Sequence, residues 1–124
     1  MIIQSKKVWF ADQFVAAQIE IEDGKITGIY PDGTKPVDKD YGNERILPGF
    51  IDVHTHGAAG VDVNAADEAG LRRIAAFFAT QGVTAFNASV LTDTPETTEK
   101  CLGAIANVMS DRGKGAQLLG AHLE

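Results

Sequence analysis

Polar and apolar residues alternate along the first 45 residues, and this alternation predicts a small antiparallel β module. Residues 2–10 form one expected strand, and 15–22 show the two-residue period of a half-buried second strand. Asp23-Gly24 predicts a tight turn, after which 25–30 completes a hairpin. Residues 31–43 are rich in proline, glycine, aspartate and asparagine and predict a loop. We therefore expect a first domain at residues 1–45.

The pattern changes after residue 45. A nearly continuous apolar run at 46–55 predicts a parallel strand covered on both faces. Further strands are expected at 83–90 and 116–124. Between the strands, apolar residues recur at helical spacing and predict two helices.

The first helix is expected at 67–80, with Asn64 or Asp67 as its cap and Gly82 just beyond its end. Its apolar face consists of Leu71, Ile74, Ala75 and Phe78. The second helix opens with Thr94-Pro95-Glu96 and is ended by Arg112-Gly113. The residues expected on its apolar face are Cys101, Ile105, Val108 and Met109.

The expected elements alternate as strand, helix, strand, helix, strand, which is the order of successive βα units. The crossover connections between such parallel strands are right-handed. A complete (β/α)8 barrel needs at least about 200 residues, and this chain has 124. We therefore expect an α/β domain at 46–124 that holds three βα strands of an incomplete barrel. Its free edges would favour poor folding or self-association of the piece alone.

Composition narrows the function classes. The net charge is −6, and Lys6-Lys7 is the only adjacent lysine pair, so nucleic-acid binding is disfavoured. No apolar run approaches the length of a membrane span. A single cysteine, Cys101, is compatible with a cytoplasmic protein, and its place in a helical pattern favours a buried apolar role over a nucleophile.

The chemically informative stretch is PGFIDVHTH at 48–56. Residues two apart on a strand point to the same side, so His54 and His56 present two imidazoles to one point. Imidazole nitrogen is a good ligand for zinc and similar metals. A His-x-His strand also occurs without metal, and spacing alone leaves both interpretations open.

This stretch resembles the first metal-binding strand of the amidohydrolase superfamily. GAAGVD at 57–62 resembles the N-acetylglucosamine-6-phosphate deacetylase family, as do QGVTAF at 81–86 and GAHLE at 120–124. The resemblance implies the N-terminal portion of such an enzyme, with a β-sandwich part at 1–45 and an amidohydrolase-type barrel part at 46–124. The full-length protein is then expected to be a homodimer.

The resemblance implies hydrolysis of N-acetylglucosamine 6-phosphate to glucosamine 6-phosphate and acetate, assisted by one or two divalent ions such as zinc or iron. His54, His56 and Glu124 are the implied metal ligands, and the presence of both histidines favours two ions. The general acid or base is an aspartate expected beyond residue 124. The 124-residue piece alone is therefore expected to be inactive.

Other polar residues near these ligands receive supporting roles. Asp52 is expected to be a hydrogen-bond acceptor or a support for the ligands. His122 either orients Glu124 or is a core histidine. Asp62 and Asn64 are expected to be turn and cap residues.

Two other functions remain open. The chain could belong to another amidohydrolase of the dihydroorotase, deaminase or D-aminoacylase type. Such enzymes typically use a lysine where this chain has Glu124. The chain could also be a non-catalytic fragment.

Overall fold

The computed structural model describes residues 1–111 and 113–124. The described chain divides into two compact units, Met1–Pro48 and Gly49–Glu124, and each is considered by itself. None of the helices in the described ranges is both long and apolar enough to cross a lipid bilayer.

The first unit is a small β-sheet. β1 (Ile2–Phe10), β2 (Gln13–Glu22) and β3 (Lys25–Pro31) are antiparallel neighbours. Both residues of the Asp23-Gly24 turn have positive φ, at 48° and 74°, as the predicted tight hairpin requires. Val8, Ala17 and Ile19 form its small core.

Two short strands complete this sheet. β4 (Lys39–Asp40) and β5 (Arg45–Ile46) both pair with β1 in parallel. The prediction of an uninterrupted loop at 31–43 was therefore wrong at β4. Backbone hydrogen bonds from Asp38 N to Ile2 O and from Tyr41 N to Gln4 O hold this segment in place. Because these bonds do not involve side chains, the segment shows no alternation of apolar residues from which a strand could be predicted.

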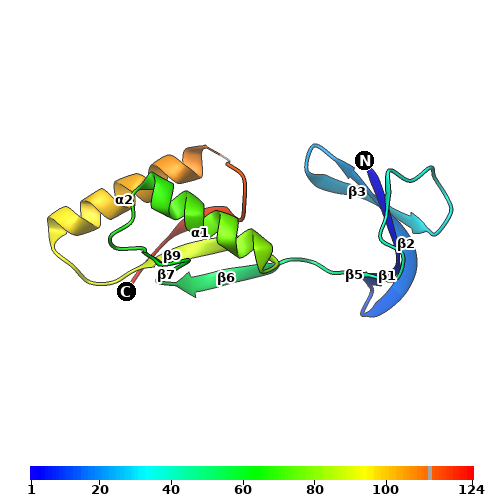
Figure 1. The fold of residues 1–124 in the computed structure, drawn as a ribbon, viewed down its shortest axis with the longest axis horizontal. Helices are drawn as coiled ribbons and strands as arrows, with labels where there is room; N and C mark the ends of the chain where they lie inside the picture. The colour runs from blue at the N-terminus through cyan, green and yellow to red at the C-terminus, as the bar shows by residue number, and fades with distance from the viewer. Residues whose placement is uncertain (112) are drawn as a thin grey trace. The chain divides into compact units, whose positions relative to one another are not determined.

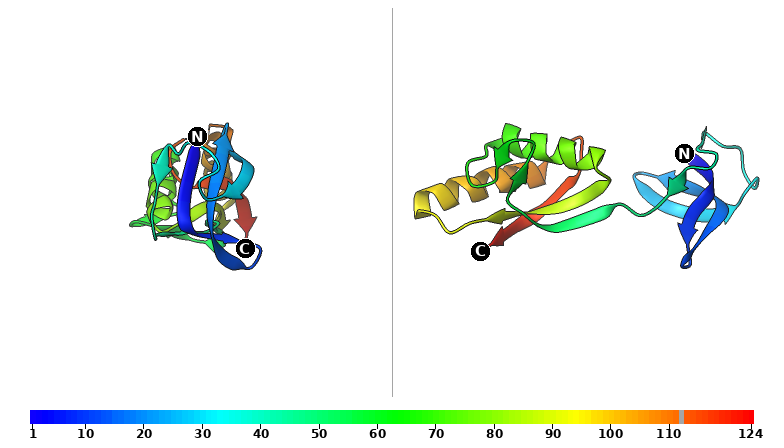
Figure 2. Two further views of the ribbon diagram at one scale, coloured as in Figure 1. Left: turned by 90° about the vertical axis from the view of Figure 1, so that its right-hand side faces the viewer. Right: turned by 60° about the horizontal axis from the view of Figure 1, so that its bottom comes forward.

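The second unit contains a three-stranded parallel sheet in the order β10-β9-β6. Its strands are β6 (Phe50–Thr55), β9 (Val83–Val90) and β10 (Gln117–Leu123). α1 (Glu68–Thr80) and α2 (Pro95–Ser110) connect them and pack on one side of the sheet (Figures 1 and 2). A short hairpin of β7 (Gly57–Ala58) and β8 (Val61–Asp62) follows β6.

The helices form where their caps and apolar spacing predict. Asp67 caps α1 by accepting a hydrogen bond from Gly70 N at 2.7 Å. Thr94 caps α2, and Pro95 is its first residue. The buried face of α1 is the predicted one, and Phe78 packs edge-to-face on Phe86 of β9 with ring centroids 5.1 Å apart.

Two packing predictions were wrong. Met109 is 44% exposed, because it lies about 80° around α2 from Cys101 and so at the margin of the apolar stripe. The strand expected at 46–55 is interrupted before Phe50 and is not covered on both faces, since Phe50, Ile51 and Val53 are 61–72% exposed. β6 is an edge strand, and in the described unit helices cover only one side of its sheet.

α2 ends at Ser110; the predicted stop residue Arg112 lies outside the described residues.

Candidate metal centre

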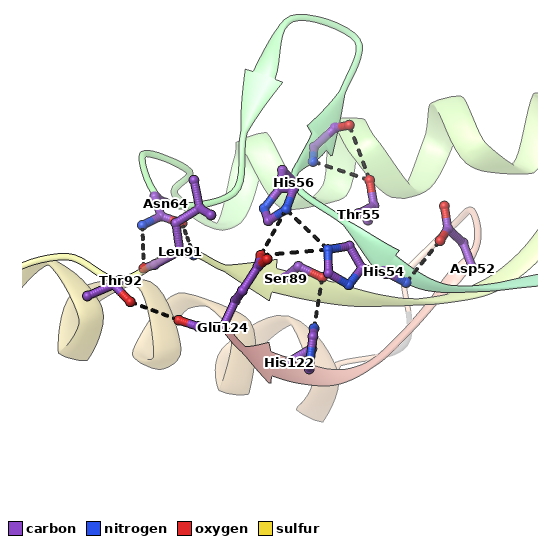
Figure 3. A network of polar contacts seen from close by, with 11 residues as sticks. Asp52, His54, Thr55, His56, Asn64, Ser89, Leu91, Thr92, His122 and Glu124 are labelled. Carbon is purple, nitrogen blue, oxygen red and sulfur yellow. Dashed lines mark hydrogen bonds and ion pairs between the residues drawn. The ribbon is translucent and has the colours of Figure 1, made fainter.

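Three donor atoms meet where β6 and β10 end. His54 Nε2 lies 3.2 Å from His56 Nε2, and Glu124 Oε2 lies 3.1 Å from His56 Nε2 and 3.7 Å from His54 Nε2 (Figure 3). Each side chain retains 39–47% of its exposure, so the group is open to solvent on one side. The structure thus brings together the two histidines and the glutamate that the family resemblance implies as ligands.

The separations between these atoms match the dimensions of a small cation site. Ligand atoms of a tetrahedral zinc ion with bonds of roughly 2.0–2.1 Å lie roughly 3.3–3.4 Å apart. The three measured distances fall on either side of this value. Two neutral imidazoles and one carboxylate are also a donor set that zinc and related metals accept. The residues present therefore fit one divalent cation.

The end of β6 aims both imidazoles at this point. Thr55, between them, is buried on the opposite side of the strand, so His54 and His56 share the other side. The chain turns immediately afterwards at Gly57, whose φ is +133°. A Cβ there would collide with the carbonyl oxygen of Val61, so this position requires glycine. A hydrogen bond from Val63 N to His56 O at 2.9 Å closes the turn.

The end of β10 is fixed by its backbone. Glu124 N donates to Val90 O at 3.0 Å, and Glu124 O accepts from Thr92 Oγ1 at 2.9 Å. The loop containing Thr92 is in turn fixed by Asn64, whose amide donates to Leu91 O at 3.0 Å and accepts from Leu91 N at 2.9 Å. A chain of hydrogen bonds therefore links the loop after His56 to the backbone of Glu124 (Figure 3).

Asp62 and Asn64 were expected to be turn and cap residues, and only Asp62 has the expected role. Asp62 Oδ1 accepts from Asn64 N at 2.8 Å, which is a turn role. Asn64 does not cap α1, because Asp67 does. It binds the loop after β9 and also reaches Asp93 Oδ2 at 3.4 Å. The backbone N–H of Thr94, together with this Asn64 contact, holds the pKa of Asp93 below its ordinary value.

The supporting residues lie beside the three donors. Asp52 Oδ1 accepts from His54 N at 3.1 Å, so it acts as a hydrogen-bond acceptor on the chain entering the site. His122 is exposed, and its Nδ1 lies 3.4 Å from Ser89 Oγ. The sequence did not predict the roles of Ser89 and Thr92 or the contact of Asn64 with the loop after β9, since nothing in their local sequence indicates a partner some thirty positions away.

Cys101 plays no part in this group. It is 2% exposed, and its Sγ donates to Val63 O at 3.2 Å within the core. Burial, with a smaller contribution from the charge of Asp62, raises the pKa of the Cys101 thiol. A thiol held protonated in the core is a poor nucleophile.

Comparison with known proteins extends these observations. No family model matches the chain. N-acetylglucosamine-6-phosphate deacetylase of Vibrio furnissii is 37% identical over 95% of the chain and 29% of its own length. N-acetylgalactosamine-6-phosphate deacetylase of Escherichia coli O157:H7 is 36% identical over 86% of the chain and 28% of its own length. The chain therefore spans less than a third of the curated relatives it matches.

Solved structures of the same kind of enzyme are also similar to the chain. The N-acetylglucosamine-6-phosphate deacetylase of Thermotoga maritima matches 99% of the chain with a TM-score of 0.77 and 27% identity, over 31% of its own chain. The corresponding enzyme of Mycobacterium smegmatis has the same fold, with a TM-score of 0.85 over 35% of its chain at 24% identity. By fold and by sequence, nearly the whole chain is similar to enzymes of the amidohydrolase class. Within that class, the resemblance to the N-acetylglucosamine-6-phosphate deacetylases is confirmed, over about 30% of their length.

Proposed function

We propose that His54, His56 and Glu124 hold a divalent cation in a protein that removes the acetyl group from an N-acetylhexosamine 6-phosphate. The observation that carries this proposal is the convergence of three donor atoms from two strands, all within 4.8 Å of one another. Exposed carboxylates are common on protein surfaces, but a carboxylate directly opposite two imidazole nitrogens is a specific arrangement.

The chemistry follows from the donor set. A divalent ion held by these residues would polarise the amide carbonyl of the substrate and make water available as a nucleophile near neutral pH. His54 and His56 would hold the ion through their imidazole nitrogens, and the carboxylate of Glu124 would offset part of its charge. Three protein ligands would leave further coordination positions of the ion for substrate or water. Thr92, through the backbone of Glu124, keeps the carboxylate at this position.

The substrate class follows from the relatives. The Vibrio furnissii and Thermotoga maritima proteins are named for N-acetylglucosamine 6-phosphate. The Escherichia coli O157:H7 protein is named for the galactosamine epimer. We propose N-acetylglucosamine 6-phosphate as the substrate, and the epimer as the second candidate.

The remaining parts of the proposal concern architecture. Residues 46–124 supply three βα strands of an incomplete barrel, and residues 1–45 supply part of a β-sandwich. The metal is zinc, iron or a similar ion, bound singly or as a pair. The full-length protein is proposed to be a cytoplasmic homodimer. Because its relatives are about three times as long, the 124-residue chain alone is proposed to be inactive.

Acetate release tests the proposal. The natural gene product that carries this sequence is assayed with both epimeric substrates, before and after chelation, together with its His56→Ala and Glu124→Gln variants. We expect activity that is lost on chelation, restored by added metal and lost in both variants. Full activity in the variants would refute the ligand assignment. Acetate release by the isolated 124 residues would refute the inactivity of the piece.

A further inference from the structure

The imidazole of His54 lacks the hydrogen bond that usually orients a metal-binding histidine. Such a ring normally donates its second N–H to a carboxylate or carbonyl, which fixes its direction. No described residue hydrogen-bonds Nδ1 of His54, although Nε2 faces His56. Nδ1 of His56 is likewise buried without a partner among the described residues. Among the described residues, His54 is therefore contacted by neighbouring rings and not by a hydrogen-bond partner of Nδ1.

His122 supplies this packing. Its ring lies 4.9 Å from that of His54, centroid to centroid, at an interplanar angle of 61°. His56 lies on His54 at 5.0 Å and 80°. Both contacts have the edge-to-face geometry that aromatic rings favour. The His54 ring thus contacts two imidazoles, one of them a fellow ligand.

Ser89 holds His122 in this position. The two residues are direct neighbours in the register of β9 and β10, and Ser89 Oγ lies 3.4 Å from His122 Nδ1. Ser89 is completely buried, and a buried hydroxyl needs a hydrogen-bond partner. His122 is the partner that the described residues provide. The middle strand therefore contributes to the site although it supplies none of the three donors.

We propose that His122, anchored by Ser89, is a positioning residue that keeps the His54 imidazole directed at the cation. This inference rests on the proposed function, because it assumes that His54 binds a metal. It differs from the expectation that His122 orients Glu124: the hydrogen bond of His122 goes to Ser89, and its ring contact is with His54. His122 acts through His54 and is not itself a ligand.

Cobalt binding to the natural gene product that carries this sequence tests the proposal, because the visible spectrum of Co²⁺ reports ligand geometry independently of activity. We expect His122→Ala to weaken Co²⁺ affinity about 10-fold and to alter the spectrum, as is typical when a support of a ligand is removed. His122→Phe keeps a ring beside His54 and is expected to restore most of the affinity. Ser89→Ala releases the ring and should weaken affinity less than His122→Ala. Phe77→Ala, which removes an exposed ring from α1, is the matched control.

The outcomes separate the two proposals. Wild-type affinity and spectrum in His122→Ala would overturn the positioning role, as would a His122→Phe protein as weak as His122→Ala. If His54→Ala binds Co²⁺ as tightly as the wild type, the metal site itself fails, and this inference fails with it. Circular dichroism at 222 nm identifies any variant that does not fold. If His122→Ala does not fold, the Co²⁺ affinities of His122→Phe and Ser89→Ala test the positioning role instead.

Discussion

Metal binding should stabilise only one of the two units. All three proposed ligands lie in Gly49–Glu124, and both helices of the described chain lie there too. The single tryptophan, Trp9, lies in the other unit, where it packs on Phe14 with ring centroids 5.0 Å apart. Circular dichroism at 222 nm therefore follows the unit with the site, whereas tryptophan fluorescence follows the unit without it.

The size of the effect follows from linkage. A ligand present at 100 times its dissociation constant stabilises the folded state by about 2.7 kcal/mol when it does not bind the unfolded state. One kcal/mol moves the midpoint of a domain of 60–100 residues by roughly 4–8 °C. We therefore expect zinc at this concentration to raise the 222-nm midpoint by roughly 10–20 °C. The fluorescence midpoint should not move.

Two variants make the measurement decisive. Glu124→Gln removes one proposed ligand charge and should abolish most of the shift at the same zinc concentration. Glu99→Gln removes a comparable charge from an exposed position on α2 and should leave the shift intact. The reasoning is refuted if zinc leaves the 222-nm midpoint unchanged, or if Glu124→Gln shows the full wild-type shift.

Three further predictions concern the frame around the site. Phe86→Ala, at a completely buried position, should lower the free energy of unfolding by about 3–5 kcal/mol in urea titrations at 222 nm, whereas Phe77→Ala at an exposed position should change it far less. Asn64→Ala removes both hydrogen bonds to Leu91 and should cost about 1–2 kcal/mol in the same titration; an unchanged midpoint would contradict this role. The depressed pKa of Asp93 means that its carboxylate stabilises the fold above the ordinary pKa, near 3.8, and that this contribution is lost as the pH falls through the lowered pKa. The urea midpoint of Asp93→Asn should accordingly decline less on acidification than that of the wild type, and parallel declines would count against the contact.

Local signals in the sequence were sufficient for most elements. Leu71, Ile74 and Phe78 recur at helical spacing behind a capping aspartate, and each of these features acts within one or two turns of chain. Strand alternation likewise predicted that His54 and His56 share a side. These predictions succeeded because neighbouring residues determine them.

Features that depend on distant neighbours could not be predicted in this way. The exposure of Phe50 and Val53 depends on which faces of the sheet are covered, and an apolar run does not encode that. The pairing of Ser89 with His122 depends on the register of two strands joined by a helix. The position of Glu124 came from a resemblance, because a glutamate at the end of a strand has no chemical signal of its own.

The donors come from the two outer strands of a parallel sheet, with the middle strand between them. His56 and Glu124 are separated by about seventy positions, so they meet only after both crossovers have formed. The cation-binding site is consequently assembled late in folding, and parallel pairings of this kind form slowly. Metal capture measured in a stopped-flow refolding experiment would therefore time the completion of the Gly49–Glu124 unit, because the three donors come together only when β6, β9 and β10 have paired.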